Sequence, residues 1–312
     1  MRLGNVARMV GARATRLPHL TSIRSDVFWW EPDGRVVRVS TGDGIYYMAC
    51  IHPDGDHVVF WGGSTGRPRL WIADGTGSVD SLTDGSRSAR FPAYSADGRS
   101  LAYACSSHPL ETMEGIWGQK SNARPNPETR MSIVVRRGAS GREHEVTDGK
   151  YQDERPALSP DGKLVAFISN RRGLNGLWVA STDGLRQPRP LIVDRGVYRP
   201  WWSADGERIF FFTFGHRHQI HYVVAAGGAP VPLANDDRGF THGPYADPGG
   251  RHLIVHSTRE GRAFPNLWAL FEIPLDGGRP RRLMPPGYER GATHGTRARN
   301  GVLTFDVRRR GS

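Results

Sequence analysis

Residues 158–184, LSPDGKLVAFISNRRGLNGLWVASTDG, decide the fold. The stretch opens with a tight turn at Asp161-Gly162, where glycine can adopt the positive φ that a hairpin turn needs. The apolar run 164–168 is rich in β-branched and aromatic residues and is too short for a helix, so it predicts a strand. A second strand is predicted over 177–180. Short strands separated by glycine-containing turns predict an antiparallel meander.

The Asp-Gly turn recurs along the chain at a regular spacing. It stands at 54–55, 97–98, 161–162 and 205–206, and 249–250 is a degenerate fifth copy. Successive copies are 43, 64, 44 and 44 residues apart, and a period of about 40–45 residues is typical of a four-stranded propeller blade. Two apolar columns follow the turn, and they predict the packed face of one strand in each copy. The columns are Val58, Leu101, Val165, Ile209 and Leu253, and Phe60, Tyr103, Phe167, Phe211 and Val255.

The pattern over 159–173, S-P-D-G-K-x-x-A-F-x-S-x-R-x-G, precedes a Leu-Trp-Val strand at 177–179. This pattern resembles the TolB-type β-propeller repeat, which is also found in the propellers of prolyl-oligopeptidase-like peptidases and of oligogalacturonate lyases. The resemblance covers roughly residues 26–307 and implies an all-β propeller. It does not choose a function, because propellers host binding, scaffolding and catalysis alike.

The two ends of the chain are out of phase with the repeat. Residues 26–40 have the pattern of the last two strands of a blade, and 292–307 have that of the first two. Joined, they predict a composite blade that closes a ring of six blades. We therefore expect one domain over 26–307, a basic N-terminal arm over 1–25 and a basic tail over 308–312.

The chain is strongly basic, with a formal net charge of +11, and all but three of its 42 basic residues are arginine. No alternation of basic and aromatic residues marks a nucleic-acid face, so nucleic acid is not an expected partner. No apolar run is long enough to span a membrane, and the first twenty residues lack the apolar core of a secretory signal. A cytoplasmic monomer is the resulting expectation. Cys50 and Cys105 are expected to be buried free thiols.

Functional residues are expected at the channel mouth, where the loops that lead into each first strand converge. Counting eight residues back from each turn glycine gives Tyr47, Arg90, Glu154, Tyr198 and His242. Counting seven back gives Met48, Phe91, Arg155, Arg199 and Gly243, with Thr293-His294 in the shortened last blade. The 64-residue step places an insertion over about 106–130, which contains Trp117. Its position over the channel mouth favours a lid, and plain disorder, which its proline and polar content allows, is the alternative.

Two kinds of site fit these residues. Imidazole suits Mn, Zn and Fe, so a divalent metal is one hypothesis, with ligands His216, His218, His242, His256 and His294. Surface or hydrogen-bonded histidines are the alternative. An anion site is the second hypothesis, because Arg90, Arg155 and Arg199 come from three consecutive blades and arginine binds carboxylate or phosphate with two parallel bonds. Its alternative is an Arg–Glu network through Glu154.

The resemblance to oligogalacturonate lyases implies a metal site rich in histidine and elimination across a uronate, and residues 241–244 resemble one arm of such a site. We therefore expect a lyase or hydrolase that acts on a small anionic or uronate-like substrate. A non-catalytic TolB-like scaffold that binds a protein partner is the alternative. The expected substrate-binding residues are Arg90, Arg155, Arg199 and Trp117. The expected catalytic residues are His242, His294, Tyr198, Tyr47 and Glu154.

Overall fold

The structure, a computed structural model, describes residues 23–40, 44–63, 67–107, 130–138, 141–213, 219–233, 239–260, 268–285, 287–288 and 291–310. These residues form strands β1 to β24 and contain no helix. The expectation of an all-β fold is therefore confirmed. No helix of the described part is long and apolar enough to cross a membrane.

Four of the sheets are four-stranded antiparallel meanders whose strands follow one another in the chain. The first contains β7 (Ser88–Tyr94), β8 (Ser100–Ser106), β9 (Ser132–Arg137) and β10 (Arg142–Glu145). The second contains β11 (Asp153–Leu158), β12 (Leu164–Ser169), β13 (Gly176–Ser181) and β14 (Arg189–Ile192). The third contains β15 (Val197–Trp202), β16 (Arg208–Thr213), β17 (Gln219–Val224) and β18 (Val231–Pro232). The fourth contains β19 (Thr241–Ala246), β20 (His252–Ser257), β21 (Ala269–Pro274) and β22 (Arg281–Arg282).

The fifth sheet has eight strands and joins the two ends of the chain. One half contains β23 (Ala292–Arg297), β24 (Leu303–Arg310), β1 (Ile23–Trp30) and β2 (Val36–Arg38). The other half contains β3 (Ile45–Ile51), β4 (His57–Gly63), β5 (Arg69–Asp74) and β6 (Val79–Ser81). The halves meet at a single parallel pair, Ser25 and Ile45. Antiparallel pairing of β1 with β24 along their whole length confirms that the chain ends share a sheet.

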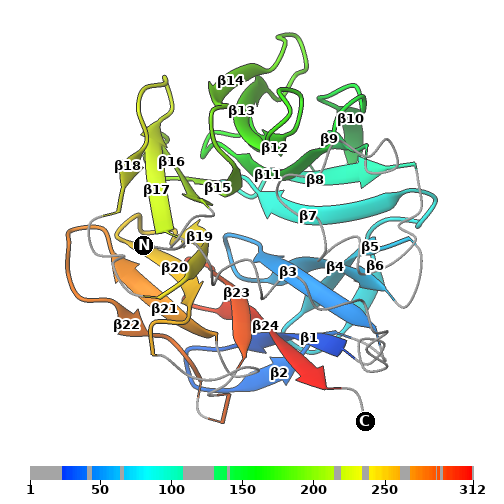
Figure 1. The fold of residues 1–312 in the computed structure, drawn as a ribbon. Coiled ribbons are helices and arrows are strands. Elements are labelled where there is room, and N and C mark those ends of the chain that lie inside the picture. Colours follow the sequence, from blue (N-terminus) through cyan, green and yellow to red (C-terminus); the bar gives the residue numbers. More distant parts are fainter. Residues whose placement is uncertain are drawn as a thin grey trace, which may run out of the picture.

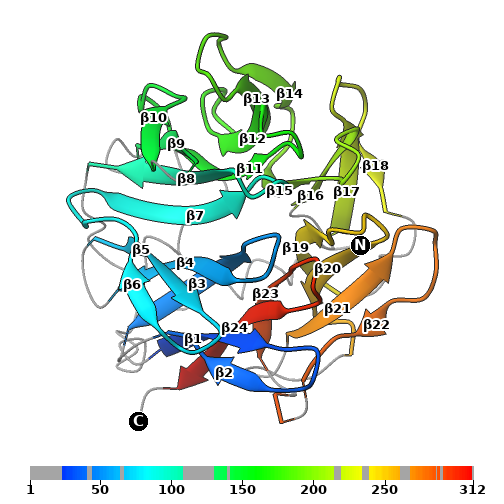
Figure 2. The ribbon, with the colours of Figure 1, turned by 180° about the vertical axis from the view of Figure 1, so that it is seen from behind.

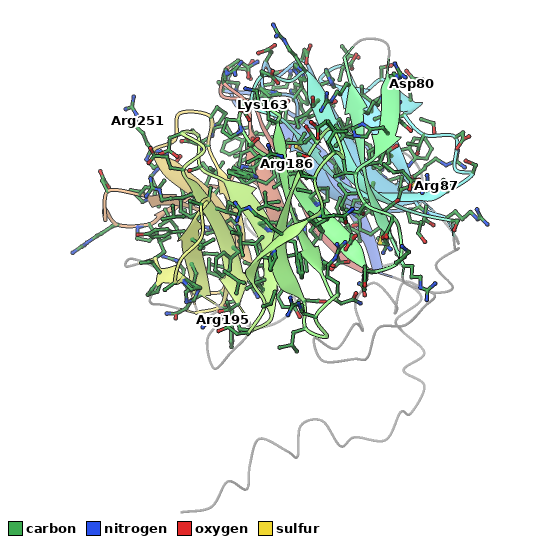
Figure 3. The ribbon with its side chains drawn as sticks, turned by 90° about the horizontal axis from the view of Figure 1, so that it is seen from above. Asp80, Arg87, Lys163, Arg186, Arg195 and Arg251 are labelled. Carbon is green, nitrogen blue, oxygen red and sulfur yellow. The ribbon has the colours of Figure 1, made fainter. Side chains whose placement is uncertain are left out.

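The sheets surround a common centre, with the first strand of each meander innermost and the last at the rim (Figures 1 and 2). Both apolar columns predicted from the repeat are buried, and each of their residues is at most 4% exposed. Burying side chains of this size contributes about 1.5–3 kcal/mol each to folding. Charged side chains cover the outside, and labelled Arg87, Arg186, Arg195 and Arg251 lie far apart on it (Figure 3).

The turn between the first two strands has the same construction in three sheets. A serine precedes the Asp-Gly pair by two residues, and its hydroxyl donates a hydrogen bond to the aspartate carboxylate, as Ser95 does to Asp97 at 2.6 Å. Ser159 and Ser203 bond to Asp161 and Asp205 in the same way. The glycine has a positive φ, 72° at Gly98, which explains why the turn requires it.

Candidate functional site

The first strand of every meander carries a β-bulge in its middle. In β7, for example, Phe91 and Pro92 together lie opposite the single residue Tyr103 of β8, because pairing passes from Arg90–Ala104 to Ala93–Ala102. Equivalent shifts interrupt the pairing of β3, β11, β15, β19 and β23. A bulge of this kind re-aims side chains at the rims of closed sheets.

The first residue of each bulge has a left-handed backbone. The φ values lie between 51° and 63° at Met48, Phe91, Arg155, Arg199, Gly243 and His294. Residues other than glycine rarely adopt this backbone conformation, and each one that does lowers the free energy of unfolding by about 1–3 kcal/mol. The next residue is proline at Pro92, Pro156, Pro200 and Pro244. Proline suits the second bulge position, since a residue outside the ladder needs no N–H donor.

These left-handed residues line one small cavity on the axis of the molecule. Its volume is about 50 Å³, and its wall includes Met48, Phe91, Arg155, Arg199, Gly243 and His294. Cys50 also lines this cavity, and burial raises the pKa of its thiol to about 12, so the thiol is not a reactive thiolate. The free cysteines are buried, as predicted.

The neighbouring column, eight residues before the turn glycine, does not line the cavity. Tyr47 is 2% exposed and packs in a hydrophobic cluster with Trp61, while Tyr198 is stacked on Phe212 with 5.6 Å between ring centroids. Glu154 is buried as well, at 5% exposure. The structure therefore brings together the residues that lie seven positions before each turn glycine. It packs Tyr47 and Tyr198, the predicted proton-transfer residues, between the sheets.

Arg90 and Arg155 both lie against the aromatic ring of Phe91. The guanidinium carbon of Arg155 is 4.5 Å from the centroid of Phe91, and that of Arg90 is 5.4 Å away. Arg155 Nε lies 3.4 Å from the carboxylate of Glu154. Arg90 is only 3% exposed, and its Nε has no hydrogen-bond partner among the described residues. The predicted Arg–Glu network thus has a direct Arg155–Glu154 contact, while Arg90 interacts with Glu154 through its charge without a direct ion pair among the described residues.

Arg199 reaches from its own sheet to the neighbouring one, across Gly243. A Cβ placed on Gly243 would lie 2.6 Å from Arg199 Nη1 and 2.9 Å from His256 Cε1. Only a residue without a side chain leaves room for the guanidinium and the imidazole here. Gly243 therefore leaves space for Arg199 close to His256 of the next sheet.

Positive charge at the cavity exceeds the negative charge around it. Burial, together with repulsion from Arg155, lowers the pKa of Arg199 to about 9, and burial lowers that of Arg90 to about 10. The carboxylates of Asp306 and Glu154 act to raise the pKa of Arg199 and Arg90 respectively, but burial outweighs them. Each guanidinium keeps its proton at neutral pH even so. Among the described residues, neither Arg90 nor Arg199 forms an ion pair. An anion in the cavity would be stabilised by these charges.

His294, also in the cavity wall, is held by a buried carboxylate. Its Nδ1 lies 2.9 Å from Asp306 Oδ1, and Asp306 is fully buried. The same carboxylate accepts a hydrogen bond from the Thr293 hydroxyl at 2.6 Å and one from the Met48 backbone N–H at 3.3 Å. A proton on Nδ1 satisfies this arrangement, and Nε2 is then the basic atom of the ring.

Three histidines follow one another beside the cavity. The ring centroids of His242 and His256 are 5.4 Å apart, and those of His256 and His294 are 4.8 Å apart. His242 itself stacks on Phe212 at 4.5 Å. The row brings together three of the five histidines predicted from the sequence. The other two, His216 and His218, lie outside the described residues, as does Trp117 with most of the 106–130 insertion.

No family model matches the chain. The chain is similar to the uncharacterized peptidase YuxL of Bacillus subtilis, with 30% identity over 204 residues, which is 62% of this chain and 27% of that protein. It thus spans about a quarter of the length of this curated relative.

Solved structures show the fold more fully. The putative TolB from Agrobacterium tumefaciens has a TM-score of 0.69 at 18% identity, over 92% of this chain and 99% of that one. The oligogalacturonate lyase of Vibrio parahaemolyticus has a TM-score of 0.58 at 11% identity, over 87% of this chain and 80% of that one. Such identities show the fold alone. The protein therefore has the β-propeller fold that TolB and oligogalacturonate lyases share.

An oligogalacturonate lyase has been solved in complex with manganese, so the fit of a metal to the channel needs a test. The described residues contain two groups whose ligand atoms lie close enough to hold an ion, and neither includes His242, His256 or His294. Arg199, a fixed cation, also lies against His256. The described part of the channel therefore does not suit a metal, and its chemistry is derived below from its own side chains.

Proposed function

We propose that this protein binds the anionic group of a small ligand in its channel and acts on that ligand as a lyase or hydrolase. The observation that carries the proposal is the shared cavity of Arg155, Arg199 and His294. Arg155, Arg199 and a histidine oriented by Asp306 face the same space, and among the described residues Arg199 forms no ion pair, whereas Arg155 lies 3.4 Å from Glu154. A pair of arginines beside an oriented imidazole suits proton transfer next to a bound carboxylate.

The cavity volume limits what can enter the channel. One buried water needs about 10–15 Å³ by this measure, so 50 Å³ holds on the order of four waters. That is the size of one carboxylate or phosphate group, while pockets for whole drug-sized ligands have about 300–1,000 Å³. The anionic group would enter the cavity, and the remainder of the ligand would lie above it.

For a uronate-like substrate the arrangement supports elimination. Arg155 and Arg199 hold the carboxylate, and their charge stabilises the enolate that forms when the adjacent C–H loses its proton. His294 Nε2 accepts that proton, and the electron pair of the C–H bond forms a C=C bond as the C–O bond on the next carbon breaks. The leaving oxygen takes the C–O electron pair and receives a proton from water. Asp306 stabilises the resulting imidazolium.

The proposal includes a ring of six blades. Its support is the division of the eight-stranded sheet into two four-stranded halves that share only the Ser25–Ile45 pair. With the four separate sheets, these halves make six equivalent units, and each contributes one left-handed residue to the cavity wall.

Calorimetric titration with acetate, inorganic phosphate and galacturonate tests anion binding directly. We expect at least one of these anions to bind the wild-type protein, and Arg199→Gln to weaken it at least tenfold. Arg186→Gln removes the same charge from the outer surface and should bind as the wild type does. Equal affinities in the wild type and Arg199→Gln would refute the anion site.

Catalysis is tested separately with oligogalacturonate, by following the absorbance of the conjugated double bond that elimination creates. His294→Gln should abolish the reaction and retain galacturonate binding. Anion binding without a reaction on this substrate class would leave hydrolysis to be assayed next.

A non-catalytic TolB-like scaffold is the second candidate. It is favoured by a larger cavity of about 220 Å³, lined by Trp201, Trp202, Tyr245 and several prolines on the face that carries the Asp-Gly turns. A protein partner on that face would bind Arg199→Gln and the wild type equally, which separates the two candidates.

A further inference from the structure

One Asp-Gly turn differs from its counterparts in the type of side chain it carries. The turn between β3 and β4 reads His52-Pro53-Asp54-Gly55-Asp56-His57. Three equivalent turns begin with Ser95, Ser159 and Ser203, and end with Ser100, Leu164 and Arg208. Here histidine occupies both the first and the last position, with a second aspartate between them. Every change introduces a side chain that can coordinate a metal.

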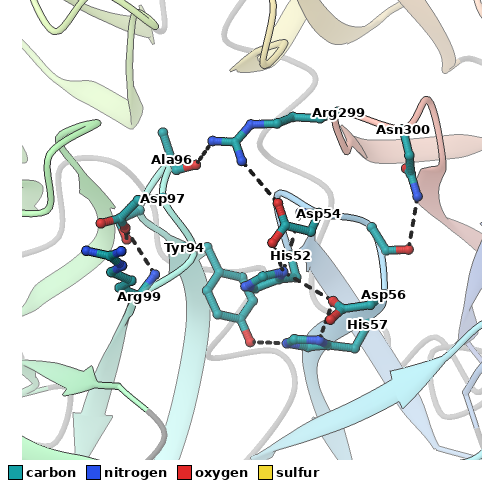
Figure 4. Close-up of polar contacts among 12 residues, drawn as sticks. His52, Asp54, Asp56, His57, Tyr94, Ala96, Asp97, Arg99, Arg299 and Asn300 are labelled. Carbon is teal, nitrogen blue, oxygen red and sulfur yellow. Dashed lines mark hydrogen bonds and ion pairs between the residues drawn. The ribbon is translucent and has the colours of Figure 1, made fainter.

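The backbone brings these side chains together. The His52 N–H donates to the His57 carbonyl at 2.8 Å, so these residues are the pair that closes the hairpin. Their rings therefore lie on the same face of the ribbon, stacked with 4.5 Å between centroids. The Asp56 carboxylate bridges the two rings, with its Oδ1 3.1 Å from His52 Nδ1 and 2.6 Å from His57 Nδ1 (Figure 4).

We infer that His52, Asp56 and His57 form a binding site for a divalent transition-metal ion such as Zn²⁺. Ligand atoms about 2.0–2.2 Å from a tetrahedral Zn²⁺ lie about 3.3 Å from one another. The distance of 3.1 Å between His52 Nδ1 and Asp56 Oδ1 is close to this value. The distance of 2.6 Å between His57 Nδ1 and Asp56 Oδ1 is shorter, so His57 and Asp56 would move slightly apart around an ion. Two imidazoles and one carboxylate form a common donor set for Zn²⁺. Asp54 Oδ2, 4.0 Å from His52 Nδ1, is a second carboxylate nearby.

A residue of the next sheet supports the site from behind. The Tyr94 hydroxyl of β7 is hydrogen-bonded to His57 Nε2 at 2.9 Å. The ring of Tyr94 also meets the rings of His52 and His57 edge-on, at 5.1 and 5.7 Å. Partners of this kind fix the orientation of metal-binding imidazoles. Tyr94 thus directs Nδ1 of His57 toward Asp56.

The site is accessible to an ion from solvent. The side chains of His52 and His57 are 14% and 25% exposed, whereas that of Asp56 is 65% exposed. Both rings also line a groove of about 480 Å³ between the two sheets. The remaining coordination positions of the ion would therefore face solvent or a ligand in the groove.

The described residues contain one other group with suitable spacing, Asp247, His252 and Glu272. There both oxygens of Glu272 are already engaged, one with Arg281 at 2.6 Å and the other with Arg297 at 2.6 Å. Two guanidinium cations would repel a metal ion. Among the described residues, Asp56 forms ion pairs with His52 and His57 alone. The nearby Arg299 pairs with Asp54 instead. Charge therefore favours the first group.

The test is Zn²⁺ binding by the full chain, measured by calorimetry after removal of bound metal with a chelator. The wild type should bind one Zn²⁺ ion at this site, and Co²⁺ in its place should give the absorption spectrum of a nitrogen–oxygen site. His52→Ser restores the residue of the equivalent turns, so the turn should still fold, and both it and Asp56→Asn should weaken binding at least tenfold. Circular dichroism verifies the fold of each variant.

Two further variants locate the ion. His252→Ala removes a ligand from the second group, and His294→Ala removes the histidine of the channel; both should bind Zn²⁺ as the wild type does. The inference is overturned if the wild type shows no saturable binding, or if His52→Ser and Asp56→Asn bind as tightly as the wild type. Loss of binding in His252→Ala or His294→Ala, with binding retained in His52→Ser, would place the ion elsewhere and also overturn it.

Discussion

Both carboxylate oxygens of Asp306 lie within hydrogen-bonding distance of His294 Nδ1, at 2.9 and 3.0 Å. The pairing of β23 with β24 places Thr293 opposite Asp306. The backbone of His294, the next residue, is left-handed, and the His294 side chain lies in the cavity wall. Asp306 therefore acts on the channel through His294, as a positioning residue. His294 and Asp306 both belong to the antiparallel β23–β24 pair, so the register of this pair brings the carboxylate to the histidine.

Replacing Asp306 with asparagine should change the protonation pattern of His294 and slow any reaction that it catalyses. The amide carries less negative charge and accepts fewer hydrogen bonds from Thr293, His294 and Met48. Nitrogen NMR should show the Nδ1–H tautomer of His294 in the wild type and a mixture in the variant, with a rate loss of about 10²-fold or more. Thr293→Val removes one donor and keeps the carboxylate, so it should preserve the tautomer. An unchanged tautomer in Asp306→Asn would contradict the positioning role.

Gly243→Ala should displace Arg199 and reduce anion binding. The new Cβ would meet Arg199 Nη1 at 2.6 Å, and the left-handed backbone, with a φ of 63°, adds strain of about 1–3 kcal/mol. Gly138→Ala is a matched control, because Gly138 has a φ of 59° and open space around it. Both variants should lose stability in urea titrations, but Gly243→Ala alone should lose affinity for the anion. Equal anion affinity in the two variants would show that Arg199 does not need this space.

The positions of the strands along the chain could be predicted from the sequence more completely than the orientations of the site residues. The turn period and the two apolar columns determine the strands, because burial on one face leaves a pattern at fixed distances from Gly98 and its equivalents. Aligning the internal repeats on the turn glycine also identified both sets of candidate channel residues, those eight and those seven positions before it. It could not tell that Arg199 faces the cavity while Tyr198 is packed away, since a bulge reverses the alternation of a strand.

Other site residues carried signals that alignment alone could not interpret. The repeated proline after the bulge, at Pro92, Pro156, Pro200 and Pro244, is visible in the sequence, and it indicates a position without a ladder hydrogen bond. Asp306 gave no such signal. It lies on the second strand of the closing sheet, and its contact with His294 depends on pairing register. The histidines of the 52–57 turn were visible too, but their convergence on Asp56 depends on side-chain rotamers.

Arg199→Met should stabilise the protein in the absence of ligand. Burial lowers the pKa of Arg199 to about 9, which means that folding holds this cation in an unfavourable environment. A side chain of similar length without the charge removes that cost, and comparable replacements of buried charges gain about 1–4 kcal/mol. Thermal and urea unfolding should show the gain, while Arg186→Met on the outer surface should stay within about 0.5 kcal/mol of the wild type. A destabilised Arg199→Met would show that the guanidinium is already compensated within the protein.

Acid should destabilise the protein partly through Glu272. Burial acts to raise the pKa of this carboxyl, but hydrogen bonds from Arg281 and Arg297 outweigh burial and hold the pKa below its ordinary value. The folded state therefore binds fewer protons than the unfolded state in this range, and stability falls as the pH falls from the unfolded pKa through the lowered folded pKa. Urea titrations at a series of acidic pH values should show a shallower decline for Glu272→Gln than for the wild type. Glu207→Gln, at an exposed position, should keep the wild-type slope, and an equally steep decline in Glu272→Gln would assign the acid sensitivity to other carboxylates.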